Sequence, residues 1–281
     1  MNTDLIIRIS AFFGMLAIMA VWERVAPRRA WSTSRSRRWV INLAMGGINT
    51  VFLRVLTASG AVGAAALAGQ GEVGLFHQVD WPWWVELNLA VILLDLVVYF
   101  QHVLMHAVPI LWRLHMVHHT DVDFDVTTGV RFHPLEILLS MLIKISAVLL
   151  IGASPGAVVA FEVLLNATSM FNHSNVRIPW TLDRLLRWFL VTPDMHRIHH
   201  SVIPWETNRN FGFNLPWWDR LLGTYWRDPI QGHERMETGL KEYRDATQLT
   251  WWRLMGLPFV GKPGKYPTWQ TDEVEVPPRH D

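Results

Sequence analysis

Long apolar runs alternate with short polar segments over the first two thirds of the chain. Residues 5–21, 39–68 and 85–100 form runs that are long enough for helices that cross a bilayer. Residues 135–151 and 155–171 flank a Gly-Ala-Ser-Pro turn, which predicts a helical hairpin whose two ends lie on the same side. We therefore predict an all-α integral membrane helical bundle, with about three spans plus this same-side hairpin.

The charges of the connecting segments predict the orientation of the bundle. Residues 24–38 carry six arginines, a composition typical of a cytoplasmic segment, whereas residues 69–84 carry Glu72 and Asp80 but no Lys or Arg. A cleavable signal peptide over the first run is the alternative, although no small-residue cleavage pattern precedes the arginines. The expected location is the cell inner membrane.

Composition limits both the partners and the chemistry. The chain is 51% hydrophobic with a formal net charge of +1, so a membrane is expected and a nucleic-acid partner is not. It contains no cysteine, which excludes disulfides, iron–sulfur ligation by this chain and thiolate zinc sites. Any bound metal must be held by nitrogen and oxygen atoms.

The pattern suggests three regions. We expect an N-terminal transmembrane region over residues 1–84, a catalytic domain over 85–228 and a C-terminal extension over 229–281, whose last twenty residues are rich in proline and charge and predicted to be disordered. Within the second region, Trp180–Leu190 has the pattern of a short amphipathic helix on the membrane surface. Phe211–Tyr225 mixes glycine, proline and aromatic residues and is expected to pack over the site.

Histidines are concentrated in the middle of the chain. Ten of the thirteen lie between residues 102 and 200, including an HxxxH pair and two HxxHH motifs, with Pro109 separating the pair from the first motif. A lone histidine on an apolar face is usually structural, but this clustering predicts a metal site. The candidate ligands are His102, His106, His115, His118, His119, His133, His173, His196, His199 and His200.

Ten imidazoles suit two metal ions better than one, since a single zinc takes three or four ligands. Neutral imidazoles suit iron, copper, zinc or nickel and do not balance the metal charge. Carboxylates are therefore expected to hydrogen-bond the far ring nitrogens. Asp95, Tyr99, His102 and His106 form one polar stripe on a helix. The candidates for these outer positions are Asp95, Tyr99, Glu136 and Asp194, with Asp121, Asp123 and Asp125 also suitably placed.

These motifs resemble the fatty acid hydroxylase / sterol desaturase superfamily of integral-membrane, histidine-rich diiron oxygenases. The resemblance rests on DLVVYFQHVLMH, LWRLHMVHH, TPDMHRIHHS and NFGFNLPWWDRLLGTYW, and it covers roughly residues 85–228. His133 in RFHPLE and His173 in NHSN are well-separated single histidines, whereas some members carry a paired motif there.

The positive-inside pattern predicts that the histidine-rich metal cap is cytoplasmic. The resemblance implies two iron ions and an O2-dependent hydroxylation or desaturation of a lipid such as a sterol or a fatty acyl chain. Electrons would come from a separate donor protein, because the chain has no flavin or cytochrome motif of its own. Two alternatives remain at this stage. One is a membrane zinc hydrolase that uses the same histidines to activate water, and the other is a non-catalytic metal-binding or transport protein.

Overall fold

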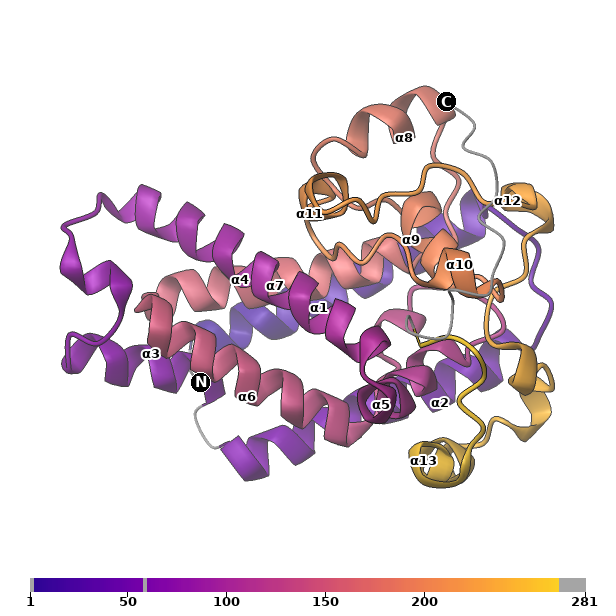
Figure 1. The fold of residues 1–281 in the computed structure, drawn as a ribbon, viewed down its shortest axis with the longest axis horizontal. Coiled ribbons are helices and arrows are strands. Elements are labelled where there is room, and N and C mark those ends of the chain that lie inside the picture. The colour runs from indigo at the N-terminus through magenta and orange to yellow at the C-terminus, as the bar shows by residue number, and fades with distance from the viewer. Residues whose placement is uncertain (1–2, 58–59, 268–281) are drawn as a thin grey trace.

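A computed structural model describes residues 3–57 and 60–267, and all regular structure within these ranges is helical. Five long helices and one shorter helix run along the long axis of the molecule as a bundle (Figure 1). They are α1 (Thr3–Val25), α2 (Arg35–Thr57), α3 (Gly60–Gln70), α4 (Trp83–Ala107), α6 (Pro134–Ile151) and α7 (Pro155–Asn172).

Shorter helices gather at one end of this bundle and form a cap (Figure 1). They are α5 (Pro109–His119), α8 (Trp180–Leu186), α9 (Pro193–His199), α10 (Pro204–Thr207), α11 (Trp217–Leu221), α12 (Gly232–Arg235) and α13 (Trp251–Val260). Single 3-10 turns lie at Leu75–Gln78 (η1), Thr128–Val130 (η2), Lys241–Tyr243 (η3) and Ala246–Gln248 (η4).

Four stretches of the described chain are long and apolar enough to cross a membrane: Thr3–Val25, Arg35–Gln78, Trp83–Ala107 and Pro134–Ile151. The first three correspond to the three predicted spans, with α2 and α3 together in the second. The predicted hairpin is confirmed as α6 and α7, which lead away from the cap and back to it (Figure 1). The all-α membrane bundle expected from the sequence is therefore what the structure shows.

Close packing of backbone holds the far end of the bundle together. Gly152 ends α6 in the left-handed conformation, with φ 74°, and Gly74 has φ 112°. A Cβ on Gly74 would lie 2.4 Å from Cα of Gly152, so neither position has room for a larger residue. Helices within a bilayer gain little from the hydrophobic effect when they associate, so small residues that let two backbones approach closely stabilise their packing. α3 likewise buries Ala61, Ala64, Ala65 and Ala68.

Proline and N-cap residues set the helix boundaries near the cap. α5, α6, α7 and α9 each begin with proline at the first helical position, where its missing N–H has no consequence. The predicted break at Pro109 is confirmed, because α4 ends at Ala107 and α5 begins at Pro109. This sharp turn brings the histidines at the end of α4 against those of α5.

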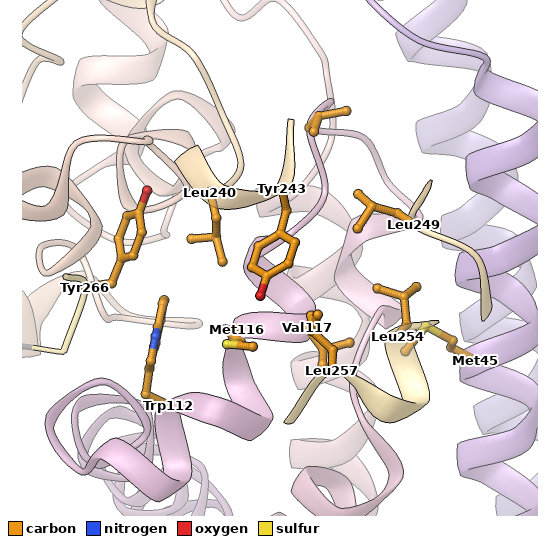
Figure 2. Close-up of a cluster of buried hydrophobic side chains, with 11 residues drawn as sticks. Met45, Trp112, Met116, Val117, Leu240, Tyr243, Leu249, Leu254, Leu257 and Tyr266 are labelled. Atoms are coloured by element: carbon orange, nitrogen blue, oxygen red, sulfur yellow. The ribbon is translucent and has the colours of Figure 1, made fainter. Parts of the chain in front are cut away.

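An apolar core joins the C-terminal segment to α5 and α2 (Figure 2). Trp112 stacks on Tyr266, with ring centroids 5.6 Å apart, and its indole N–H donates to the carbonyl of Pro263. The expected disorder of the last twenty residues is therefore wrong for residues 262–267, because Tyr266 is 1% exposed within this core. The rest of that prediction, over residues 268–281, lies outside the described residues.

Candidate metal centre

Nine histidines come together where the bundle meets the cap. Their side chains form two groups, in each of which the candidate ligand nitrogens all lie within 4.8 Å of one another. One group has five members and the other four: His102, His106, His115, His119 and His199, and then His118, His173, His196 and His200. The two groups adjoin, since the rings of His119 and His200 stack with centroids 4.5 Å apart.

Secondary structure explains this convergence. His102 and His106 occupy the last two turns of α4, while the first HxxHH motif occupies the end of α5. His173 follows α7 directly as its C-cap residue, and the second HxxHH motif lies on α9 and its C-cap. Four helix C-termini thus deliver the nine imidazoles to one place.

The hydrogen bonds of the five-histidine group indicate how its rings are protonated. Nδ1 of His102 lies 2.8 Å from the carbonyl oxygen of Phe211, and Nδ1 of His115 lies 2.6 Å from Oε1 of Glu136. Because both partners are acceptors, both Nδ1 atoms carry the proton and both Nε2 atoms present lone pairs. These two Nε2 atoms are 3.2 Å apart, so they repel one another unless a cation binds both.

The four-histidine group repeats this arrangement around His173. Its Nδ1 donates to the carbonyl of Ser169 at 2.7 Å, which leaves Nε2 as a lone pair. That Nε2 lies 3.1 Å from Nε2 of His118 and 3.1 Å from Nε2 of His196. Both ring nitrogens of His200 are buried without a hydrogen-bond partner. Unpartnered buried nitrogens that converge on one point fit a bound metal ion.

Burial keeps these imidazoles neutral, as metal ligation requires. For the grouped histidines outside the candidate spans, burial and then the neighbouring imidazoles lower the pKa well below its usual value of 6.5: His118, His119, His196, His199 and His200. Burial lowers the pKa of His173 to about 3. At neutral pH, these rings are therefore in the ligating form before any metal arrives.

His133 is the one predicted ligand that the structure does not bring to the others. It is the N-cap residue of α6, where its Nδ1 accepts a hydrogen bond from the backbone N–H of Leu135. Its Nε2 faces the carbonyl of Met255, 3.2 Å away. The ring therefore caps the start of a helix and faces α13, so it lies outside both groups, and nine of the ten candidate ligands come together.

Glu136 lies where the sequence predicted, against a grouped histidine, but Asp95 and Tyr99 do not. The carboxylate of Asp95 accepts hydrogen bonds from the backbone N–H groups of Asn214 and Leu215 and from the indole of Trp218. The hydroxyl of Tyr99 lies 2.8 Å from that of Thr224. Both residues therefore attach the segment after α10 to α4 rather than contacting an imidazole.

The predicted acidic partners in the cap bind arginines or backbone groups instead. Asp194 accepts from Arg28 and Arg197, whose positive charges hold its pKa well below the usual range. Asp121 pairs with buried Arg38 at 2.6 Å, and the guanidinium lowers the pKa of that carboxyl to about 2. Asp125 binds the same arginine and Asp123 binds the Ser32–Thr33 backbone. These carboxylates therefore bind arginines and backbone rather than the grouped histidines.

Other hydrogen-bond acceptors, not predicted from the sequence, face two of the grouped histidines. Nδ1 of His199 faces the carbonyl of Arg209 at 2.8 Å, and Nδ1 of His106 faces Oδ1 of Asn208 at 3.2 Å. Together with the carbonyl of Phe211, these acceptors come from one short segment, residues 208–211. Backbone carbonyls have no sequence signature, so only the motif NRNFGF could have drawn attention to this segment.

The buried carboxylate of Asp219 holds this segment in shape. It accepts hydrogen bonds from the N–H groups of Phe211 and Gly212, at 2.7 and 2.8 Å. A Cβ on Gly212 would lie 2.6 Å from that carboxylate, so only glycine fits. The rings of His102, His106 and His199 all lie within 5.5 Å of the Phe211 ring, which confirms that this segment packs over the site.

Comparisons with known proteins match the part of the chain that contains the two histidine groups. The family model described as fatty acid hydroxylase matches residues 87–224. The chain is 29% identical to an ornithine lipid hydroxylase of Rhizobium tropici over 78% of its own length and 66% of that protein. It is 31% identical to the human alkylglycerol monooxygenase over 52% of its length and 31% of that protein.

A human cholesterol 25-hydroxylase is 29% identical over 47% of this chain and 48% of that protein. The match thus covers less than two thirds of each of these relatives. No solved structure matches the chain. The family match lies on the segment that supplies all nine grouped histidines. The matched segment, residues 87–224, is similar to the fatty acid hydroxylase family.

Proposed function

We propose that this protein is a membrane-bound non-haem diiron oxidoreductase that uses O2 to hydroxylate a lipid. The observation that carries the proposal is the pair of adjoining, buried, all-histidine groups. The relatives named above are hydroxylases and a monooxygenase of lipids, which favours oxygen insertion over desaturation.

The nine grouped histidines are the proposed ligands of two iron ions. Iron held there would supply the redox chemistry that activates O2 for attack on an unactivated C–H bond. The donor set favours iron over hydrolytic zinc, since neither group includes a carboxylate among the described residues, and dinuclear hydrolases usually recruit bridging carboxylates. The Nδ1 partners orient the rings, and Glu136 supplies negative charge against His115.

The fold supports a lipid substrate and a membrane location. The histidines lie at or just beyond the ends of helices, where the bundle meets the cap. A hydrocarbon chain dissolved in the bilayer would therefore reach the site from the bundle side of the cap. The proposed catalytic domain, residues 85–228, includes every grouped histidine. Burial of the whole cluster would keep water from a reactive centre. Electrons are proposed to come from a separate donor protein.

The arginine-rich segment between α1 and α2 lies on the cap side, because Arg28 and Arg29 both hydrogen-bond to Asn175 just after α7. By the positive-inside rule we place the cap in the cytoplasm and the bundle in the inner membrane.

The decisive experiment is metal analysis with Mössbauer spectroscopy, on protein purified in mild detergent from cells grown with iron-57. The proposal expects two magnetically coupled, reducible irons per chain, followed by incorporation of label from isotopic O2 into a lipid. Two zinc ions from iron-rich, zinc-poor cells would instead support the hydrolase. A single metal, or none, would overturn the dinuclear site.

A further inference from the structure

Five aromatic side chains enclose the nine histidines, and three of them contact one group only. Trp112 and Phe211 pack on the five-histidine group, and Phe124 packs on the four-histidine group. These three side chains are at most 5% exposed. They therefore form closed outer walls, through which nothing as large as a lipid chain could approach.

Phe213 differs because it contacts both groups and is partly exposed. Its ring centroid lies 6.4 Å from those of His102 and His173 and 6.3 Å from that of His196. His102 belongs to the five-histidine group and the other two belong to the four-histidine group. This ring therefore lies across the junction of the two proposed metal positions.

Phe132 lies across the same junction from another element. Its ring stacks on His118 of the four-histidine group, with centroids 4.4 Å apart and an interplanar angle of 10°. It also lies 6.4 Å from the ring of His115 in the five-histidine group. Like Phe213, it is partly exposed.

Helices of the bundle anchor the backbone of both residues. The carbonyl of Phe213 accepts a hydrogen bond at 3.0 Å from Asn172, the last residue of α7. The carbonyl of Phe132 accepts one at 2.8 Å from Asn49 of α2, and Phe132 itself lies two residues before α6 begins. Both residues are thus anchored through their backbone carbonyls to helices of the bundle, and their partly exposed rings lie where the bundle meets the cap.

We propose that Phe132 and Phe213 form an aromatic wall between the bilayer and the metal pair, which a lipid hydrocarbon chain must contact and which determines the carbon atom that reaches the metals. This inference rests on the proposed function for its second clause only. Contact with acyl chains depends on the fold and holds even without metal. The two clauses can therefore be tested apart.

The first test is photocrosslinking in nanodiscs of palmitoyl-oleoyl phosphatidylcholine, with p-benzoylphenylalanine at one position at a time. Benzophenone reacts only with groups in contact with it. We therefore expect phospholipid adducts at positions 132 and 213 and no adduct at position 124. Position 13 is the positive control, since Phe13 lies on the candidate span Thr3–Val25 and is 61% exposed. Labelling at 13 but at neither 132 nor 213, or equal labelling at 124, would overturn the wall.

The second test uses Phe213→Leu, Phe213→Ala and Phe132→Ala in the metal-loaded protein with the lipid that isotopic O2 identifies. We expect full metal content and a shift in the position of the introduced oxygen along the chain. Phe124→Ala is the matched control and should leave the position unchanged. An unchanged product position in all the wall variants would refute the specificity role. Failure to oxidise any lipid would refute the proposed function instead, while the adducts would still report on the wall.

Discussion

Glu136 illustrates how one side chain can tune the proposed centre. Its Oε1 accepts from His115 at 2.6 Å, and its Oε2 is buried without a hydrogen-bond partner. We expect Glu136→Ala to weaken metal binding by about 10- to 100-fold, because removing the partner of a ligating histidine frees the ring and lowers its basicity. Glu136→Gln should lose less, since the amide oxygen can still accept the hydrogen bond. Titration of the metal-free protein with cobalt measures both.

His133 provides the matched control for that experiment. Replacing it with alanine removes an N-cap and should lower stability by about 1 kcal/mol while leaving the metal content unchanged. The same substitution at His173 should reduce the metal content. Equal metal loss from His133→Ala would show that the ring moves into the site on loading. Equal cobalt affinity in Glu136→Ala and the parent protein would show that the carboxylate does not tune His115.

The depressed pKa of His173, about 3 against a usual 6.5, predicts how the metal-free protein responds to acid. Below about pH 6.5, His173 binds a proton in the unfolded chain but not in the folded protein. The free energy of unfolding is therefore greatest above that pH and falls as the pH falls toward 3. Each such histidine contributes a slope of about 1.4 kcal/mol per pH unit. Melting temperatures in detergent should therefore drop between about pH 7 and about pH 5, less steeply in His173→Asn. A flat profile would contradict the buried neutral state.

At the scale of elements, the segment from Asn208 to Asp219 hydrogen-bonds to histidines of one group. Its carbonyl and amide oxygens face His102, His106 and His199, which all belong to the five-histidine group. In the four-histidine group, His173 is held by α7 itself. Disturbing the segment should therefore affect the two metal positions unequally.

Asp219→Asn tests this inequality. An amide can accept from only one side through its oxygen, so either the Phe211 or the Gly212 N–H loses its partner and the segment loosens. We expect one metal per chain to be lost and one retained, as measured by metal analysis and by the loss of magnetic coupling. Asp183→Asn, which breaks a cap ion pair with Arg187, is the control and should retain both metals. Loss of both metals in equal measure would mean that Asp219 supports the whole cap rather than one group.

The same segment shows where prediction from sequence ends. Helical spacing and apolar run length are local properties, so α4, α5, the α6–α7 hairpin and the nine histidines that gather in two groups could be predicted. The partners of a histidine depend on how distant segments meet. Asp95 and Asp194 lie near histidines in sequence yet bind a backbone segment and arginines, while distant Phe211 and Arg209 supply carbonyls. His133 resembles a ligand by composition, but the N-cap of α6 turns its ring toward α13.

At the scale of the whole molecule, all nine grouped histidines lie at one end of the bundle and the α3–α4 connection lies at the other (Figure 1). The orientation of this axis can be tested cleanly because the chain has no cysteine of its own. Asp80, before α4, and Gln231, beside α12, are both exposed and lie at the two ends. A single cysteine at either position should react with a maleimide once it is reachable.

A membrane-impermeant maleimide applied to intact cells should label Asp80→Cys at once and Gln231→Cys only after the membrane is permeabilised. The reason is the excess of arginine in residues 24–38, which favours the cytoplasmic side for the cap, against acidic residues alone in residues 69–84. The reverse pattern would place the metal centre outside the cytoplasm. The proposed electron donor would then have to be a protein of that outer compartment, so the labelling result decides where the donor must be sought.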